Sequence, residues 1–157
     1  MPTEYQGELD ARDKKFAIVA ARWHQRFSST LLSGAIETLV QHGADEENIE
    51  VYRCPGSFEI PQVASRVAGE RDVDAIVCLG VLVRGETPHF DYIASEATAG
   101  IGRAGTDGDV PVTYGVLTCD TMEQAMARSG SKQGNKEAEA AEAAVEMASL
   151  YEQIEGT

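Results

Sequence analysis

Four continuous apolar runs, each followed by a helical pattern, constrain the fold of this chain more than any other feature of the sequence. The runs are expected as strands at residues 15–21, 49–54, 74–83 and 110–118. Apolar spacing predicts helices at 28–42, from Pro61 onward, from Pro88 to about 104, at 122–129 and from 136 to about 154. Strands that are apolar on both faces are typical of a parallel sheet covered by helices on both sides. The pattern predicts an α/β protein, a flavodoxin-like three-layer α/β/α sandwich with a four-stranded parallel sheet.

Local signals predict where several of these helices begin and end. Gly43 is expected to stop the first helix. Thr87 is a good N-cap with Pro88 as the first helical residue, and Asn135 is the expected cap of the last helix.

The length of 157 residues suits one domain, 1–157, rather than two. No apolar run is long enough to cross a bilayer, and the first ten residues lack the basic and apolar regions of a signal peptide. We therefore expect a cytoplasmic protein without a membrane partner. The three cysteines have no CxxC spacing and fall in or next to strand runs, which favours buried free thiols.

The chain carries 26 acidic and 13 basic residues, a net charge of -13. Nucleic acid is a poor partner for such a surface, because proteins bind phosphate backbones through lysine and arginine. The three histidines show no metal-ligand spacing, so no metal site is expected.

Polar and aromatic residues gather where three of the predicted strands end. Trp23 follows the first strand, residues 55–59 follow the second, and residues 84–89 follow the third. Ligands of such sheets lie beyond the carboxyl ends of the strands, so these loops predict a common site. His89 would lie in the first turn of a helix, where unpaired N–H groups suit an anion, and it can exchange a proton near pH ~6.5.

Four stretches carry a family resemblance: ARWHQRFSSTLLSGA (21–35), PGSFEIP (55–61), GVLVRGETPHFDYI (80–93), and ARSGSKQGNK with the glutamate-rich helix after it (127–146). In this order and over nearly the whole length, the chain resembles the 6,7-dimethyl-8-ribityllumazine synthases. The resemblance implies condensation of 5-amino-6-(D-ribitylamino)uracil with 3,4-dihydroxy-2-butanone 4-phosphate, with loss of phosphate and water. It implies small-molecule substrates, no cofactor, and riboflavin synthase as a possible partner.

The resemblance also implies a role for each matching residue. His89 would transfer protons, and Arg128 would clamp the phosphate. Trp23 would lie over the pyrimidine-like substrate. The other substrate-binding residues that it implies are Gly56, Ser57, Phe58, Glu59, Val81, Leu82, Val83, Gly85, Glu86, Thr87, Tyr114 and Lys136.

Taken alone, several of these residues also allow a purely structural interpretation. Trp23 could pack under a loop, and residues 55–57 could act only as turn residues. Thr87 and Pro88 could simply start a helix, and Arg128 could offset the dipole at a helix end.

In the family Arg128 and Tyr114 serve the site of a neighbouring subunit, so the resemblance implies a homo-oligomer. It would be a pentamer, or a decamer or sixty-subunit shell built from pentamers. Glu137 stands where the family usually has glycine, and together with the acidic surface this weakly disfavours further packing of pentamers. Residues 1–13 are expected as an extension that could add an edge strand to a neighbour.

Two other functions remain open at this point. One is an archaeal-type riboflavin synthase, which would form riboflavin from the lumazine alone. The other is a flavin-binding or shell-forming protein without catalysis.

Lysine occurs only at positions 14, 15, 132 and 136, so the acidic surface has few ammonium groups to offset it. We predict a protein suited to high salt, because salt screens the self-repulsion of such a surface. Its melting temperature should be higher in molar KCl than in dilute buffer. Equal or lower stability in molar salt would contradict this expectation.

Overall fold

The computed structural model describes residues 1–85, 88–129 and 135–156, and it contains one four-stranded parallel sheet. The strands are β1 (Phe16–Ala21), β2 (Ile49–Cys54), β3 (Ala75–Val83) and β4 (Val112–Cys119). Their order across the sheet is β2-β1-β3-β4, so β2 and β4 form the edges. The predicted strands and their parallel arrangement are confirmed.

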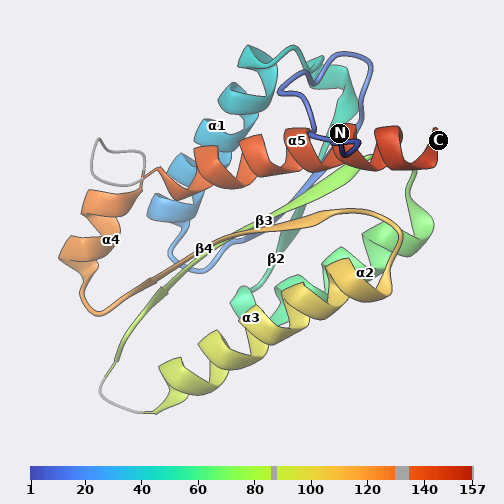
Figure 1. Cartoon of the computed structure of the whole chain (residues 1–157). Coiled ribbons are helices and arrows are strands. Elements are labelled where there is room, and N and C mark those ends of the chain that lie inside the picture. The colour runs from blue at the N-terminus through green and yellow to red at the C-terminus, as the bar shows by residue number, and fades with distance from the viewer. Residues whose placement is uncertain (86–87, 130–134, 157) are drawn as a thin grey trace.

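Helices cover both faces of this sheet, which confirms the three-layer sandwich (Figure 1). Helices α1 (Gln25–Gln41) and α5 (Lys136–Glu155) lie on one face with the short α4 (Met122–Arg128) beside them. Helices α2 (Ile60–Glu70) and α3 (His89–Asp107) lie on the other face. Two single 3₁₀ turns, η1 (Glu46–Asn48) and η2 (Ser57–Glu59), lie in the connections around β2.

Burial on both faces explains why the two central strands are apolar throughout. In β1, Phe16 and Ile18 pack toward α1 and α5, whereas Ala17 and Val19 pack toward α2 and α3. All four side chains are fully buried. A shift of one residue in strand pairing would exchange the two faces, so this packing fixes the register of the strands and the position of their ends.

Helix starts agree with the sequence except at α1 and α3. Helix α1 begins at Gln25, earlier than predicted, because His24 precedes it in a left-handed conformation (φ 59°). Pro88 is the N-cap of α3 rather than its first residue, and the predicted cap Thr87 lies outside the described residues. Asn135 occupies the predicted cap position of α5, but its side chain makes no capping hydrogen bond. Gly43 follows α1 as expected, with a φ of 109°.

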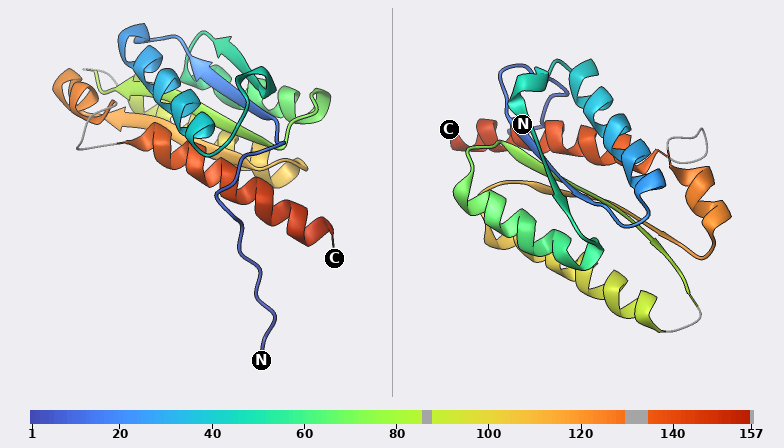
Figure 2. Two further views of the ribbon diagram at one scale, coloured as in Figure 1. Left: turned by 90° about the horizontal axis from the view of Figure 1, so that it is seen from above. Right: turned by 180° about the vertical axis from the view of Figure 1, so that it is seen from behind.

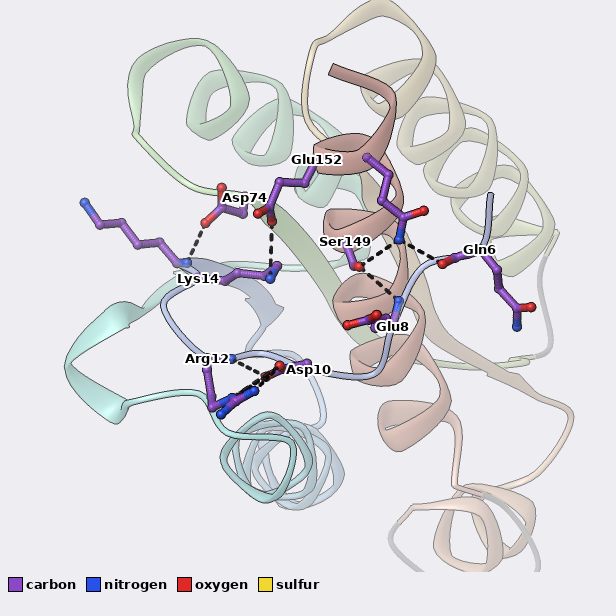
Figure 3. A network of polar contacts seen from close by, with 10 residues as sticks. Gln6, Glu8, Asp10, Arg12, Lys14, Asp74, Ser149 and Glu152 are labelled. Carbon is purple, nitrogen blue, oxygen red and sulfur yellow. Dashed lines mark hydrogen bonds and ion pairs between the residues drawn. The ribbon is translucent and has the colours of Figure 1, made fainter. Parts of the chain in front are cut away.

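The N-terminal end of the chain extends away from the body of the protein, and the segment that follows it lies along α5 (Figure 2). The Nε2 of Gln153 donates to the carbonyl of Gln6 (2.8 Å), and the amide of Glu8 donates to the Oγ of Ser149 (2.9 Å) (Figure 3). Lys14 forms an ion pair with Glu152 at 3.3 Å. Residues 1–5 are exposed and belong to no strand of this chain.

All three cysteines are buried and unpaired, as the sequence predicts. No helix among the described residues is long and apolar enough to span a membrane.

A buried carboxylate at the start of α5 was not predicted. Glu137 is only 1% exposed and packs against Gly34 of α1, where a Cβ would lie 2.8 Å from its Cγ. Its Oε2 has no hydrogen-bond partner among the described residues. Burial raises the pKa of Glu137, because the charged form loses its hydration.

We predict that Glu137→Gln raises the melting temperature at neutral pH. When folding raises the pKa of a carboxyl group, that group does not destabilise the protein at pH values below its ordinary pKa. At higher pH it does, and the destabilisation grows until the pH has passed the folded pKa. The gain should therefore be larger at neutral pH than in acid, where it should vanish, and each kcal/mol should raise the melting temperature by ~2–4 °C. Glu139→Gln, an exposed carboxylate in the same first turn, is the matched control. A gain that persists unchanged in acid would contradict the assignment.

Candidate active site

A cavity of about 600 Å³ opens at the carboxyl ends of β1, β2 and β3, a size that suits a small molecule. Its lining comes from the loops after these strands, the end of β3 and the first turns of α3. The lining residues are Trp23, His24, Gly56, Ser57, Phe58, Glu59, Val81, Leu82, Val83, Gly85, His89, Phe90 and Ile93. Every site residue predicted from these three loops that the structure describes lies in this cavity. Glu86 and Thr87 lie outside the described residues.

Backbone hydrogen bonds join the first two of these loops. Ala21 and Cys54, the last residues of β1 and β2, stand side by side in the sheet. Beyond them, the amide of Arg22 donates to the carbonyl of Cys54 (2.9 Å), and the amide of Trp23 donates to the carbonyl of Pro55 (3.1 Å). The pairing of β1 with β2 therefore continues past the sheet and holds Trp23 beside the second loop.

The indole of Trp23 lies directly on the backbone of Gly56. A Cβ at position 56 would lie 2.5 Å from Cδ1 of the indole, which is closer than side chains approach one another. Trp23 is nevertheless 68% exposed. A large aromatic ring held by backbone and still open to solvent can stack on a flat ligand, so the alternative of a tryptophan packed under a loop does not hold.

Ser57 lines the cavity, but its hydroxyl is turned into the protein. The residue is 4% exposed, and its solvent-inaccessible Oγ has no hydrogen-bond partner among the described residues. The hydroxyl lies against β3, 2.8 Å from where a Cβ at Gly80 would be. The Oγ therefore packs against the sheet and is not exposed to the cavity.

His89 is the first residue of α3 and lies at the cavity with the N-terminus of that 19-residue helix. The cap residue Pro88 provides no side-chain hydrogen bond to this first turn. Such an end attracts anions through its N–H groups and the helix dipole. The imidazole is exposed and can therefore exchange protons with a bound molecule.

The cysteine nearest the cavity is not a nucleophile. Burial, with the charge of Glu59 nearby, raises the pKa of Cys54 to about 11. Its Sγ donates to the carbonyl of Gly56 at 3.5 Å. The thiol is thus neutral at physiological pH and supports the turn.

Sequence reasoning missed three lining residues. His24 takes a left-handed backbone conformation (φ 59°), which is uncommon for residues other than glycine and often marks functional sites. Its position just past a strand end was the available signal. Phe90 and Ile93 come from the inner face of α3 and could have been found from the helical spacing after His89.

The remaining predicted residues form a second, separate pocket of about 290 Å³ at the edge strand β4. It is lined by Tyr114, Val116, Leu117, Thr118, Arg128, Asn135, Lys136 and Glu139, and it shares no residue with the first cavity. The Nζ of Lys136 lies 5.4 Å from the centre of the Tyr114 ring. The Tyr114 hydroxyl is 2.9 Å from the Oγ1 of Thr98 on α3, so the ring is held from both sides.

Arg128, at the end of α4, and Lys136 supply the positive charges of this second pocket. Arg128 also neighbours Cys119, whose pKa is raised by burial and partly lowered again by the guanidinium. The described residues contain no group of three or more His, Cys, Asp or Glu side chains arranged to hold a metal ion.

These features define an α/β protein with two pockets. An aromatic and polar cavity lies at the carboxyl ends of β1, β2 and β3, and a basic pocket lies at the edge strand β4. Residues 13–152 match the family model of 6,7-dimethyl-8-ribityllumazine synthase. Proteins of that name from Salinibacter ruber and Chloroherpeton thalassium are 51% and 50% identical, covering 99% and 95% of this chain and 100% and 96% of their own length. A third, from Prosthecochloris aestuarii, is 48% identical over 95% of this chain and 96% of its own. The chain belongs to the 6,7-dimethyl-8-ribityllumazine synthase family.

We predict that Gly56→Ala moves the indole of Trp23, because a methyl group would occupy the space of Cδ1. Trp23 is the only tryptophan, so intrinsic fluorescence reports on this contact alone. Acrylamide quenching should become stronger while the melting temperature changes little. Gly69→Ala is the matched control, since a Cβ there meets nothing within 4 Å. Identical quenching in the wild type and Gly56→Ala would refute the contact.

Proposed function

We propose that this chain is a lumazine synthase that condenses 5-amino-6-(D-ribitylamino)uracil with 3,4-dihydroxy-2-butanone 4-phosphate. The family match over residues 13–152 carries the proposal, together with a cavity that contains the matching motif residues. In the reaction the 5-amino group attacks the ketone and water leaves, giving an imine. Elimination of phosphate and ring closure through the ribitylamino nitrogen, with loss of a second water, complete the lumazine.

The uracil substrate is assigned to the part of the cavity below Trp23. The exposed indole over the backbone of Gly56 suits a flat conjugated ring. Ser57, Phe58 and Glu59, which line the cavity, would bind the ribityl chain and the ring edges. Val81, Leu82 and Val83 would contribute backbone groups and packing from the end of β3.

The phosphate is assigned to the start of α3. The positive end of the α3 dipole favours a dianion, and Gly85, Glu86 and Thr87 match the phosphate-binding turn of the family. His89 would then stand beside the phosphate-bearing substrate and transfer protons during imine formation and elimination. Holding both substrates in line contributes the rest of the rate.

Arg128, Tyr114 and Lys136 would complete the site of a neighbouring subunit. The two pockets share no lining residue within one chain, and the second lies on an edge strand, where another chain can approach. Membership of this family implies a homo-oligomer, and we propose a pentamer. Decamers and sixty-subunit shells are the larger assemblies open to it. In all of them the guanidinium of Arg128 would hold the phosphate through paired N–H donors.

Two further assignments follow from the family rather than from one residue. Residues 1–13 would form an extension of the single domain, and the exposed residues 1–5 are free to add a strand to a neighbour's sheet. The protein would work in the cytoplasm.

An absorbance assay with both purified substrates tests the function. Formation of the coloured lumazine and inorganic phosphate is the expected result, with no addition of metal or cofactor. Riboflavin formed from lumazine alone would instead indicate a riboflavin synthase, and binding without turnover would indicate a flavin-binding protein.

We predict that His89→Ala and Arg128→Ala impair the enzyme in different ways. His89→Ala should fold and bind both substrates but lose about 10²–10⁴-fold in kcat, the usual share of general acid–base catalysis. Arg128→Ala should raise the KM of the phosphate substrate by ~10–100-fold, since hydrogen bonds to charged groups contribute about 1.5–3 kcal/mol. The KM of the uracil substrate should change much less.

Mixed assemblies test the shared site. When the two variants are co-expressed in equal amounts, about a quarter of the interfaces in a ring would combine an intact His89 with an intact Arg128. Activity should therefore recover to roughly that fraction, while each variant alone stays impaired. Native mass spectrometry confirms that the subunits have mixed. Mixed rings without recovered activity would show that both residues act within one subunit.

A further inference from the structure

The guanidinium of Arg84, directly after β3, is enclosed by two carboxylates and an aromatic ring. Its Nε donates to Oδ1 of Asp120 at 3.0 Å, and its Nη1 lies 3.2 Å from Oδ1 of Asp91. Its Cζ lies 4.6 Å from the centre of the Phe90 ring, within the range of a cation–π contact. The amide of Arg84 also donates to the carbonyl of Cys119 (2.8 Å), so its backbone is fixed to the end of β4.

These contacts join the two ends of the loop that carries the start of α3. Arg84 precedes the loop, and Asp91 and Phe90 follow it in the first turn of the helix. Asp120 holds the same guanidinium from the β4 side, and its own amide donates to Oε1 of Gln124 on α4 at 2.8 Å. One side chain therefore links the ends of β3 and β4 with the turn that contains His89.

Charge and position argue against Arg84 as a phosphate ligand. Its single positive charge is shared between two carboxylates, so the cluster is net negative and would repel a dianion. Arg84 does not line the cavity, although its neighbours Val83 and Gly85 do. Arg128, in contrast, lines the basic pocket.

The cluster has more influence on geometry than on global stability. The side chains of Arg84, Asp91 and Asp120 are 45%, 58% and 67% exposed, and ion pairs this open to solvent contribute little to global stability. Pro88 provides no side-chain cap to the first turn of α3. Because a displacement of about 1 Å can cost ~10²-fold in rate, a weak contact at this place can matter for catalysis.

We propose that Arg84 is a positioning residue, which orients His89 and the phosphate-binding start of α3 through Asp91 and Phe90 without touching substrate. The proposal rests on the synthase activity proposed above. It differs from the interpretation of Arg84 as one more cationic ligand of the phosphate, and the two make opposite kinetic predictions.

The central test compares Arg84→Gln, Arg84→Lys and the wild type. Arg84→Gln should lower kcat by about 10–100-fold at saturating substrate, and change the KM of the phosphate substrate by less than about threefold. Arg84→Lys should not restore kcat, because one ammonium cannot bridge both carboxylates and lie flat on Phe90. Arg103→Gln, which removes an exposed Arg103–Glu96 pair (3.2 Å) on the same helix, is the matched control and should leave kcat unchanged.

A double-mutant cycle with Asp91→Asn tests the route of the effect. If Arg84 acts through Asp91, adding Arg84→Gln to Asp91→Asn should cost far less than Arg84→Gln alone. Fully additive losses would overturn the proposal. So would a loss confined to the KM of the phosphate substrate and rescued by lysine, because a point charge that binds phosphate directly behaves in that way.

Hydrogen exchange of the amides in the first turns of α3 provides a readout that needs no turnover. Exchange there should rise about tenfold in Arg84→Gln and stay at the wild-type rate in Arg103→Gln. If the wild type made no lumazine, the proposed function would fall, and unchanged exchange would separately refute the positioning role. Faster exchange in Arg84→Gln with unchanged kcat in an active enzyme would also refute it.

Discussion

The parallel register of β1, β2 and β3 is the constraint on which the whole site depends. In β1 and β3 alternate side chains fill two different cores, and β2 pairs in parallel with β1, so the three strands end at one edge of the sheet. The loops that follow these strands therefore meet at that edge of the sheet. Trp23, Gly56 and His89 come from three distant parts of the chain, and this register alone brings them to one cavity.

The second pocket of the molecule lies at the edge strand β4. The outer side of this strand carries Tyr114 and, with α4 and α5, a basic pocket that no residue of the first cavity reaches. In the proposed ring, neighbouring chains would combine the aromatic cavity of one subunit with the basic pocket of the next. Arg84 lies between the two regions, tied to α3 on one side and to the end of β4 on the other.

The sequence predicted the strands well because an apolar run on both faces leaves few alternatives to a covered parallel strand. It predicted helix starts less well, since the left-handed turn at His24 depends on the loop beside it and not on its own residue type. The burial of Glu137 could not be foreseen, because glutamate is rarely buried and here the space comes from Gly34 on another helix. The residues of the first cavity were predicted from strand ends and motifs together. Glu139 was missed because nothing local places it beside Arg128.

The central claim is that one chain holds two incomplete halves of a site. Its most direct test measures sedimentation velocity and specific activity on the same samples over a dilution series. The account predicts that activity per chain falls in parallel with the assembled fraction and that the separated monomer makes no lumazine. Full specific activity at concentrations where the protein sediments as a monomer would contradict it.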